Sequence, residues 1–248
     1  MNPFTFFIAA PFGNYLKFSS DKNFPICTSV TGTWTLEYRG GLMKRLWKIS
    51  STLRYDRNAK GWVNKLGLPN EGLKHGLNKT NQKEVLSIAA IKKMDWAKMG
   101  TMISDDYSIE INLSCPNVND TKVIWNDLTA FTKSNKRKWC IAKVSPLIVE
   151  DQLKFLIEKI GIKQIHLCNT LPLPKGGGLS GTQLKPYVFN LIEMIRKKWG
   201  DDIELIAGGG VQMIDDVKDY LSAGANHISL GTICFRPWKV NKIIRNKY

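Results

Sequence analysis

The stretch Ile111-Asn112-Leu113-Ser114-Cys115-Pro116-Asn117 combines a thiol, two amide side chains and a proline. Residues 107–111, which precede it, alternate between apolar and polar side chains, a pattern typical of a half-buried strand. Pro116 cannot extend a hydrogen-bonded ladder, so the strand ends and a loop begins here. A thiol in such a loop can abstract a proton while the amides hold a planar, polar substrate. A structural cysteine beside a turn is the alternative interpretation.

The rest of the chain alternates short apolar runs with amphipathic segments, which indicates repeated β-α units. The predicted strands are residues 6–10, 26–30, 85–89, 109–113, 140–144, 164–168, 205–207 and 227–230. The predicted helices are residues 150–160, 183–199, 215–223 and 238–246. Eight strands are the count of a (β/α)₈ TIM barrel, so we predict an α/β fold with residues 1–248 as a single domain.

Glycines end the last two predicted strands. The first of these strands runs into Gly208-Gly209-Gly210, and the second into Gly231-Thr232. In barrels, the loops after strands seven and eight, together with a helix N-terminus, frequently hold a phosphate, because glycine lets the backbone approach the anion. Glycines also serve plain tight turns, but two such ends in consecutive units favour a phosphate site.

Composition narrows the classes of partner. The net charge of +15 is compatible with a nucleic acid, an anionic substrate or cofactor, or simply a lysine-rich surface. The basic clusters at residues 133–138 and 196–198 lack the interleaved aromatic side chains of a nucleic-acid platform. The charge therefore does not favour a nucleic-acid partner.

The cysteines and the apolar runs indicate a cytoplasmic protein. The five cysteines are widely spaced and include no C-x-x-C pair, which favours a reducing compartment and predicts no metal site. No uninterrupted apolar run is long enough to span a membrane. The apolar N-terminus has no basic flank, so we interpret it as the first strand and not as a signal peptide.

With these features in place, the chain resembles the dihydroorotate dehydrogenases, flavin (FMN) enzymes of pyrimidine biosynthesis. The resemblance runs from about Ala9 to Trp238, and its motifs occur in the family's order. These motifs are residues 33–40 (TWTLEYRG), 64–70 (NKLGLPN), 112–117 (NLSCPN), 143–146 (KVSP), 169–170 (NT), 177–181 (GGLSG), 208–210 (GGG) and 231–232 (GT).

The resemblance implies a flavin across the barrel mouth with dihydroorotate stacked on it. By similarity, Cys115 is the base that takes the proton from carbon 5, while the hydride of carbon 6 passes to flavin N5. The cysteine, where membrane-associated members carry serine, makes the chain similar to the soluble class. A homodimer is what that class suggests.

The resemblance also implies the residues of both binding sites. Lys143 is expected beside the N1/O2 edge of the flavin, where its charge stabilises the reduced ring. The implied substrate-binding residues are Asn64, Gly67, Leu68, Asn112, Asn117, Asn169 and Thr170. The implied FMN-binding residues are Ala10, Thr33, Asn112, Lys143, Cys168, Gly181, Gly209, Gly210, Gly231 and Thr232.

Several positions depart from the family pattern. Gly32 stands where soluble members usually carry a lysine, and Ala9-Ala10-Pro11-Phe12-Gly13 replaces an Ala-Ser-Gly motif. Lys65 stands where a small residue is usual, and the loop at residues 118–122, which covers the catalytic cysteine, is short. A lid that excludes water matters for flavin chemistry, so these departures bear on activity.

The electron acceptor and two further functions stay open. Without a helical extension before the first strand, we expect no membrane docking, and a soluble acceptor such as fumarate is the default by similarity. The first alternative is a dihydrouridine synthase-like flavin enzyme, whose tRNA substrate would account for the positive charge. The second is a non-catalytic barrel relative, which Gly32 and the short lid would favour.

Overall fold

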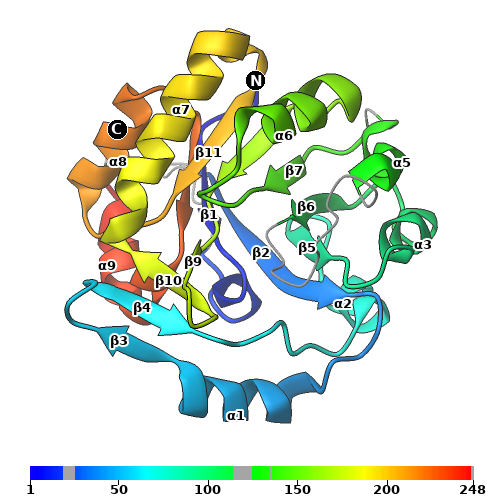
Figure 1. Cartoon of the computed structure of the whole chain (residues 1–248), viewed down its shortest axis with the longest axis horizontal. Helices are drawn as coiled ribbons and strands as arrows, with labels where there is room; N and C mark the ends of the chain where they lie inside the picture. The colour runs from blue at the N-terminus through cyan, green and yellow to red at the C-terminus, as the bar shows by residue number, and fades with distance from the viewer. Residues whose placement is uncertain (19–25, 114–124, 135, 247–248) are drawn as a thin grey trace.

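The computed structural model describes residues 1–18, 26–113, 125–134 and 136–246, and its centre is a closed barrel of parallel strands (Figure 1). The ring order is β1, β12, β11, β8, β7, β6, β5 and β2. The bounds are β1 Thr5–Ile8, β2 Ile26–Thr35, β5 Val85–Ala89, β6 Ser108–Asn112, β7 Cys140–Lys143, β8 Gln164–Leu167, β11 Glu204–Gly208 and β12 His227–Leu230. The predicted (β/α)₈ barrel and its eight strands are confirmed.

One strand is five residues longer than predicted. β2 continues to Thr35, and its register with β5 shifts between Thr31 and Trp34. Such an irregularity re-aims side chains locally. Thr33 lies inside this shift, and its hydroxyl bonds to Ser87 on β5. The longer strand therefore brings Thr33 into the mouth of the barrel.

Helices surround the barrel (Figure 1). Their bounds are α1 Gly41–Thr52, α2 Leu73–Lys79, α3 Asp95–Met102, α5 Thr129–Thr132, α6 Glu150–Lys154, α7 Lys185–Trp199, α8 Ile214–Ser222 and α9 Pro237–Ile244. The four predicted helices correspond to α6, α7, α8 and α9, and α6 continues as a π-helical turn over Phe155–Lys159. The α7 side chains Val188, Leu191, Ile192 and Ile195 are buried, as their helical spacing predicts.

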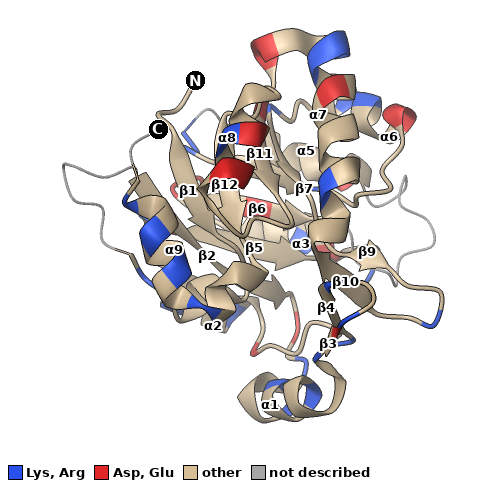
Figure 2. Cartoon of the chain, turned by 90° about the vertical axis from the view of Figure 1, so that its left-hand side faces the viewer, with Lys and Arg blue, Asp and Glu red and all other residues tan. Residues whose placement is uncertain are grey.

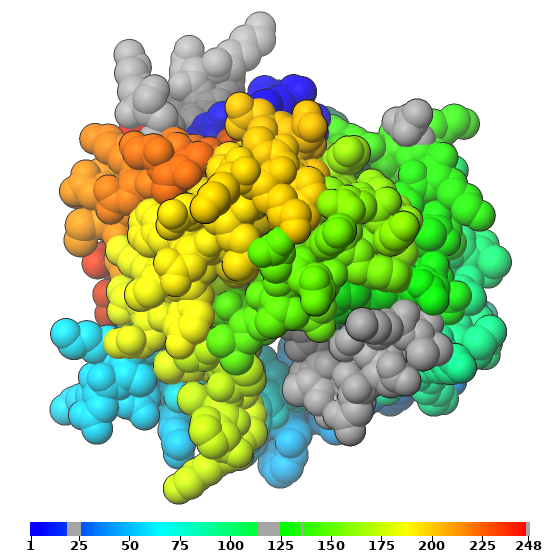
Figure 3. All heavy atoms as spheres, turned by 45° about the horizontal axis from the view of Figure 1, so that its top comes forward, coloured from blue at the N-terminus to red at the C-terminus, as the bar shows by residue number. Residues whose placement is uncertain are grey.

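A second, smaller sheet was not predicted. Its order is β3 (Arg54–Asp56), β4 (Gly61–Asn64), β10 (Gly178–Gly181) and β9 (Leu171–Pro172), with every pair antiparallel. The segment around residues 172–178 projects from the lower edge of the molecule in Figure 3. Strands this short, with glycines at their ends, carry too little periodicity to be recognised in the sequence.

The core has two parts. The larger cluster fills the space between strands and helices and includes Phe6, Ile8, Leu205 and Ile228. The smaller one consists of Phe7, Val30, Val85, Trp139, Ile141 and Ile206. Four of these alternate along their strands with residues of the larger cluster, which places the smaller cluster on the opposite, inner face of the barrel wall.

No helix in the described part of the chain is long and apolar enough to cross a membrane.

Candidate active site

A continuous line of polar side chains crosses the mouth of the barrel. Thr170 donates its backbone N–H to Asn169 Oδ1 at 2.8 Å, and Asn169 Nδ2 donates to Asn112 Oδ1 at 3.1 Å. Asn112 Nδ2 in turn donates to the Thr33 hydroxyl at 3.4 Å, which lies 3.0 Å from the Ser87 hydroxyl. These bonds fix the orientation of both amides. Three residues that the sequence assigned to substrate, and Thr33 from the cofactor set, are therefore brought together.

The line ends on a buried carboxylate, Glu110. Its Oε1 accepts a hydrogen bond from Ser87 at 2.9 Å, and its Oε2 lies 2.7 Å from His166 Nδ1. The Lys143 ammonium lies 3.8 Å from Oε1. Burial would raise the pKa of Glu110, but the Lys143 charge and the bonds from His166 and Ser87 outweigh it and lower the pKa to about 2.

His166 is neutral in this cluster. Burial, first, and the Lys143 charge, second, lower the pKa of His166 from its ordinary 6.5, although Glu110 opposes both. Because an ionised carboxylate only accepts hydrogen bonds, His166 Nδ1 carries the proton and donates it to Glu110. The positive charge of the cluster therefore lies on Lys143, at the end of β7, and balances the charge of Glu110.

Glycines occupy the neighbouring part of the ring. β11 and β12 lie side by side, and Gly209 and Gly210 follow the first while Gly231 and Thr232 follow the second. Gly209 and Gly210 have φ of +100° and +75°, a region that favours glycine. A Cβ on Gly231 would meet nothing within 4 Å, so its backbone faces open space.

Two further members of the predicted cofactor set lie beside these glycines. The Gly181 carbonyl is 3.0 Å from where a Cβ on Gly210 would stand, so the two backbones are in contact. Ala9 donates its backbone N–H to Leu230 at 3.0 Å, which brings Ala10 beside Gly231. The Tyr220 hydroxyl donates to the Gly209 carbonyl at 2.7 Å and fixes the loop.

The segment between the triple glycine and α8 is held by a carboxylate. Asp216 Oδ2 accepts from the backbone N–H groups of Gln212 and Met213, which precede α8, at 2.6 and 3.0 Å. Asp216 also pairs with Lys185. A phosphate at the glycine backbones and the α8 N-terminus stays a prediction.

The small sheet positions Asn64. In the β4–β10 ladder Gly178 pairs with Asn64, and on its other side Gly178 pairs with Pro172 of β9. A Cβ on Gly178 would stand 2.0 Å from Thr170 Oγ1. Only glycine permits this approach, so Asn64 and Thr170 both lie next to Gly178.

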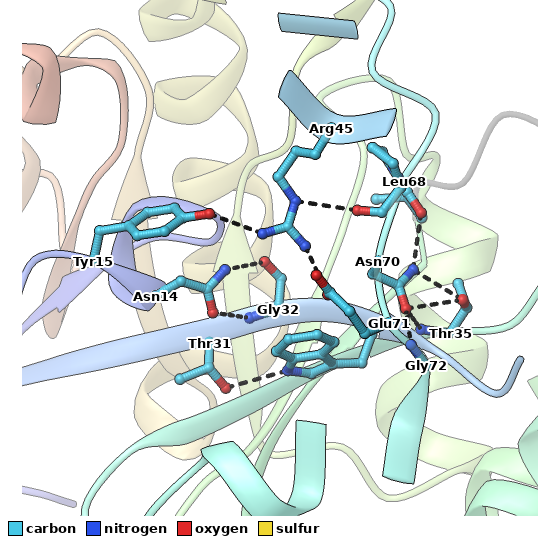
Figure 4. A network of polar contacts seen from close by, with 12 residues as sticks. Asn14, Tyr15, Thr31, Gly32, Thr35, Arg45, Leu68, Asn70, Glu71 and Gly72 are labelled. Carbon is cyan, nitrogen blue, oxygen red and sulfur yellow. Dashed lines mark hydrogen bonds and ion pairs between the residues drawn. The ribbon is translucent and has the colours of Figure 1, made fainter. Parts of the chain in front are cut away.

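Hydrogen bonds of the Asn70 side chain hold the loop after Asn64 (Figure 4). Asn70 Nδ2 donates to the Leu68 carbonyl at 2.8 Å, and Asn70 Oδ1 accepts from the Thr35 and Gly72 amides at 3.2 and 2.8 Å. Arg39 donates to the Gly67 carbonyl at 3.1 Å. These bonds shape the loop that carries the predicted residues Gly67 and Leu68.

Position 32 can only be glycine in this backbone. Asn14 bonds both sides of Gly32, donating from Nδ2 to its carbonyl at 3.0 Å and accepting its N–H at 2.9 Å (Figure 4). Gly32 has φ of +103°, and a Cβ there would lie 2.6 Å from the Ser87 carbonyl. The departure from the family's lysine is therefore built into the path of β2.

The proposed base and one substrate amide, Cys115 and Asn117, lie outside the described residues. Among the described cysteines, burial raises the pKa of Cys27, Cys140, Cys168 and Cys234 to about 12. These four thiols therefore keep their protons at neutral pH. Cys168 is buried close enough to Lys143 for that charge to oppose the shift in its pKa.

Glu110, His166 and Ser87 were not among the predicted site residues. β6 was predicted as a half-buried strand, yet all five of its residues are buried. His166, on β8, is a buried partner of Glu110. The available signal was spacing: Glu110 and Asn112 are two residues apart, so they share a face of the strand.

These observations define a class of protein: a TIM barrel with a polar, charged site at one part of its mouth and glycine backbones at the adjacent part. The match to a family model is more specific. Residues 50–247 match the model described as dihydroorotate dehydrogenase, and the chain belongs to this enzyme family.

Curated relatives agree with the family assignment, and a solved structure agrees with the fold. A relative from Listeria welshimeri, named dihydroorotate dehydrogenase B (NAD(+)), catalytic subunit, is 29% identical over 215 residues, covering 74% of this chain and 70% of the relative. One of the same name from Endomicrobium trichonymphae is 29% identical over 238 residues, covering 82% and 72%. A dihydroorotate dehydrogenase structure from Eimeria tenella, in complex with ferulenol, has a TM-score of 0.73 at 16% identity, covering 97% and 79%, and shows the fold alone.

A Gly32→Lys variant tests the constraint on β2. We expect it to lower the free energy of unfolding by about 2 kcal/mol or more, because the side chain needs an unfavourable φ and meets a carbonyl. Gly200→Lys is the matched control, since Gly200 also has positive φ but open space around it. Urea unfolding measures both, and equal losses would show that the Ser87 contact is not a constraint.

The neutral His166 predicts acid sensitivity. Its folded pKa lies below the unfolded value near 6.5, so in that window the unfolded chain binds the proton more readily. Stability should therefore fall as pH drops below about 6.5, with Glu110 adding a second loss between 4.5 and about 2.

Urea unfolding at several pH values measures this dependence. His166→Asn should be less stable at neutral pH yet lose less on going from pH 7 to pH 5, whereas His75→Gln, at an exposed position, should follow the native protein. Parallel pH profiles for the native protein and His166→Asn would contradict the assignment.

Proposed function

We propose that this chain oxidises (S)-dihydroorotate to orotate in pyrimidine biosynthesis, with FMN as its cofactor. The observation that carries the proposal is the joining of Asn169, Asn112 and Thr33 in one line that ends on the Glu110–Lys143 pair. The family is flavin-dependent in general, and the chain matches its model over residues 50–247.

The described residues fit FMN. An elongated molecule with a phosphate at one end and a ring at the other needs backbone donors and a charged, hydrogen-bonding surface at neighbouring places. Gly209, Gly210 and Gly231 offer the first, and Gly231 faces open space. Lys143, at the end of β7, offers the second. When bound, FMN supplies the acceptor for the two electrons that leave the substrate.

The amides suit a pyrimidine with a carboxylate. An asparagine presents both a donor and an acceptor, which match the N–H and C=O groups along the edge of such a ring. Asn169 uses its Oδ1 for Thr170 and one Nδ2 hydrogen for Asn112, and its second Nδ2 hydrogen is assigned to the substrate. Asn64 is proposed to hold the substrate from the small sheet.

Cys115 is proposed as the base that takes the proton from carbon 5. In the sequence it follows Asn112 by three residues, and Asn112 is the last residue of β6, the strand that carries Glu110. The four described cysteines keep their protons, and none of them competes for this role.

For the electron acceptor, the names of the relatives favour NAD⁺ over fumarate, which the resemblance to the soluble class had implied. The relatives carry NAD(+) in their names and are called catalytic subunits. We propose that electrons leave this chain through a second subunit toward NAD⁺.

Anaerobic absorbance tests the reaction. FMN-loaded protein should lose its yellow colour on addition of dihydroorotate, and Cys115→Ala should slow the bleaching by about 100-fold or more. Cys27→Ala, which removes a thiol at the start of β2, should bleach at the native rate. A protein that binds FMN but does not respond to dihydroorotate would refute the substrate. A protein that cannot be loaded with FMN would support the non-catalytic alternative.

The Lys143–Glu110 pair predicts opposite shifts in the reduction potential of bound FMN. Lys143→Met removes the positive charge and should lower the potential, whereas Glu110→Gln leaves that charge uncompensated and should raise it. We expect shifts of roughly 30 mV, the value for a tenfold change in a two-electron equilibrium. Dye-coupled titration measures them, and shifts of the same sign would contradict this role.

A further inference from the structure

Helix α1 buries a charged side chain and exposes apolar ones, the reverse of an ordinary surface helix. Its buried side chain is the charged one, Arg45, which is 8% exposed. Leu42, Met43, Leu46 and Trp47 are 50, 78, 52 and 62% exposed. These four side chains, here called the α1 crest, occupy positions i, i+1, i+4 and i+5, which form one face of a helix. In Figures 1 and 2 the helix lies at the lower edge of the molecule, away from the barrel.

Hydrogen bonds of Arg45 fix the orientation of the crest. Arg45 Nε donates to the Pro69 carbonyl at 3.2 Å, Nη1 to the Tyr15 hydroxyl at 2.9 Å, and Nη2 to Glu71 Oε2 at 3.2 Å (Figure 4). Rotating the helix to bury the crest would break all three bonds and leave Glu71 without this partner. The apolar face therefore points outward as a consequence of the fold.

The surrounding segment is strongly basic. Residues 39–70, which include α1 and the β3–β4 hairpin, contain eight Lys and Arg residues and a single acid, Asp56. Their net charge of +7 is almost half of that of the whole chain. Lys44 and Lys48 lie one turn apart on α1, and the Lys48 ammonium is 5.3 Å from the centre of the Trp47 ring. The crest is thus an apolar ridge in a basic field.

Contrary to the expectation of no membrane docking from the sequence, we propose that the α1 crest binds the surface of an anionic lipid bilayer. A helix with Trp and Leu on one face and lysines beside them lies in the interface, with its apolar side chains among the acyl chains and its lysines at the headgroups. The positive field adds attraction to anionic lipid. The inference does not depend on the proposed reaction.

Physical arguments favour lipid over a second copy of the chain and over RNA. A second copy of the chain would bring +7 against +7 at the same face, which opposes self-association. A single-stranded RNA needs aromatic side chains on which its bases stack, but three of the four crest residues, Leu42, Met43 and Leu46, are aliphatic. A bilayer accepts a ridge of mixed aliphatic and aromatic side chains without a matching groove.

Docking would also orient the barrel. Arg45 and Arg39 join the α1 region to the carbonyls of Pro69 and Gly67, in the loop that follows Asn64. A protein bound through the α1 crest therefore lies with this loop next to the lipid. The mouth of the barrel, which this loop borders, would open close to the membrane surface.

Vesicle flotation tests the proposal with the whole protein. Vesicles of equal parts phosphatidylcholine and phosphatidylglycerol should carry the protein upward, and vesicles of phosphatidylcholine alone should carry much less. Leu46→Ser with Trp47→Ser should remove binding. Lys44→Glu with Lys48→Glu should weaken it by about tenfold or more, because each basic residue near an anionic surface contributes to the affinity.

Two matched variants serve as controls. Trp238→Ser removes an equally exposed tryptophan from α9, and Lys133→Glu with Lys136→Glu reverses two charges before β7, at the opposite end of the barrel from the mouth. Both should bind vesicles as the native protein does. All variants change exposed or half-buried side chains, so thermal unfolding should be unchanged, and this checks that a loss of binding is not a loss of folding.

Several results would overturn the proposal. These are no flotation with anionic vesicles, binding that survives both crest variants, and a dimer in sedimentation that the crest variants dissociate. Retention of RNA that only the crest variants lose would also refute the lipid assignment.

Discussion

The buried charge of Glu110 is the constraint on which the site depends. A carboxylate without solvent is stable only when a counter-charge and donors surround it, and Lys143, His166 and Ser87 supply them from three other strands. Because these partners lie on β5, β7 and β8 around β6, one carboxylate ties four neighbouring strands at the level of the mouth. The same requirement holds the Lys143 side chain at the end of β7, because its ammonium pairs with Glu110. Structural stability and the position of the cationic group thus have one cause.

Much of the barrel could be predicted from the sequence because its strands are short apolar runs and its helices have helical spacing. The small sheet could not, since β9 has two residues and β10 consists mainly of glycine and small side chains. Its existence depends on contacts distant in the sequence, such as the packing of Gly178 on Thr170. Local pattern carries no information on pairing of this kind, although the residues that the sheet positions, Asn64 and Thr170, were recognised.

The site likewise has residues that could be predicted from the sequence and residues that could not. Asn112 was recognisable because it lies in a polar stretch at the end of a predicted strand, whereas Lys143 and Asn169 were named through the resemblance to the family. Glu110 and His166 were not recognisable, since an alternating strand is consistent with a polar face toward solvent, and only closure of the barrel turns that face inward. Gly32 illustrates the converse. In the sequence, Gly32 is noticed because soluble members of the family usually carry a lysine at this position. In the structure, Asn14 and the Ser87 carbonyl leave no room for a side chain there.

The requirement that a buried charge be hydrogen-bonded also determines which face α1 exposes. In the barrel, charged groups are buried because they satisfy one another; in α1, Arg45 is buried because the carbonyl of Pro69, the hydroxyl of Tyr15 and Glu71 satisfy it. The helix thereby presents Leu42, Met43, Leu46 and Trp47 to the outside. A fold that only had to be stable in water would bury those side chains and expose the arginine, so hydrophobic burial within this chain does not account for the arrangement. The Arg45 bonds hold the loop after Asn64, and the outward apolar face is the physical consequence of building that loop.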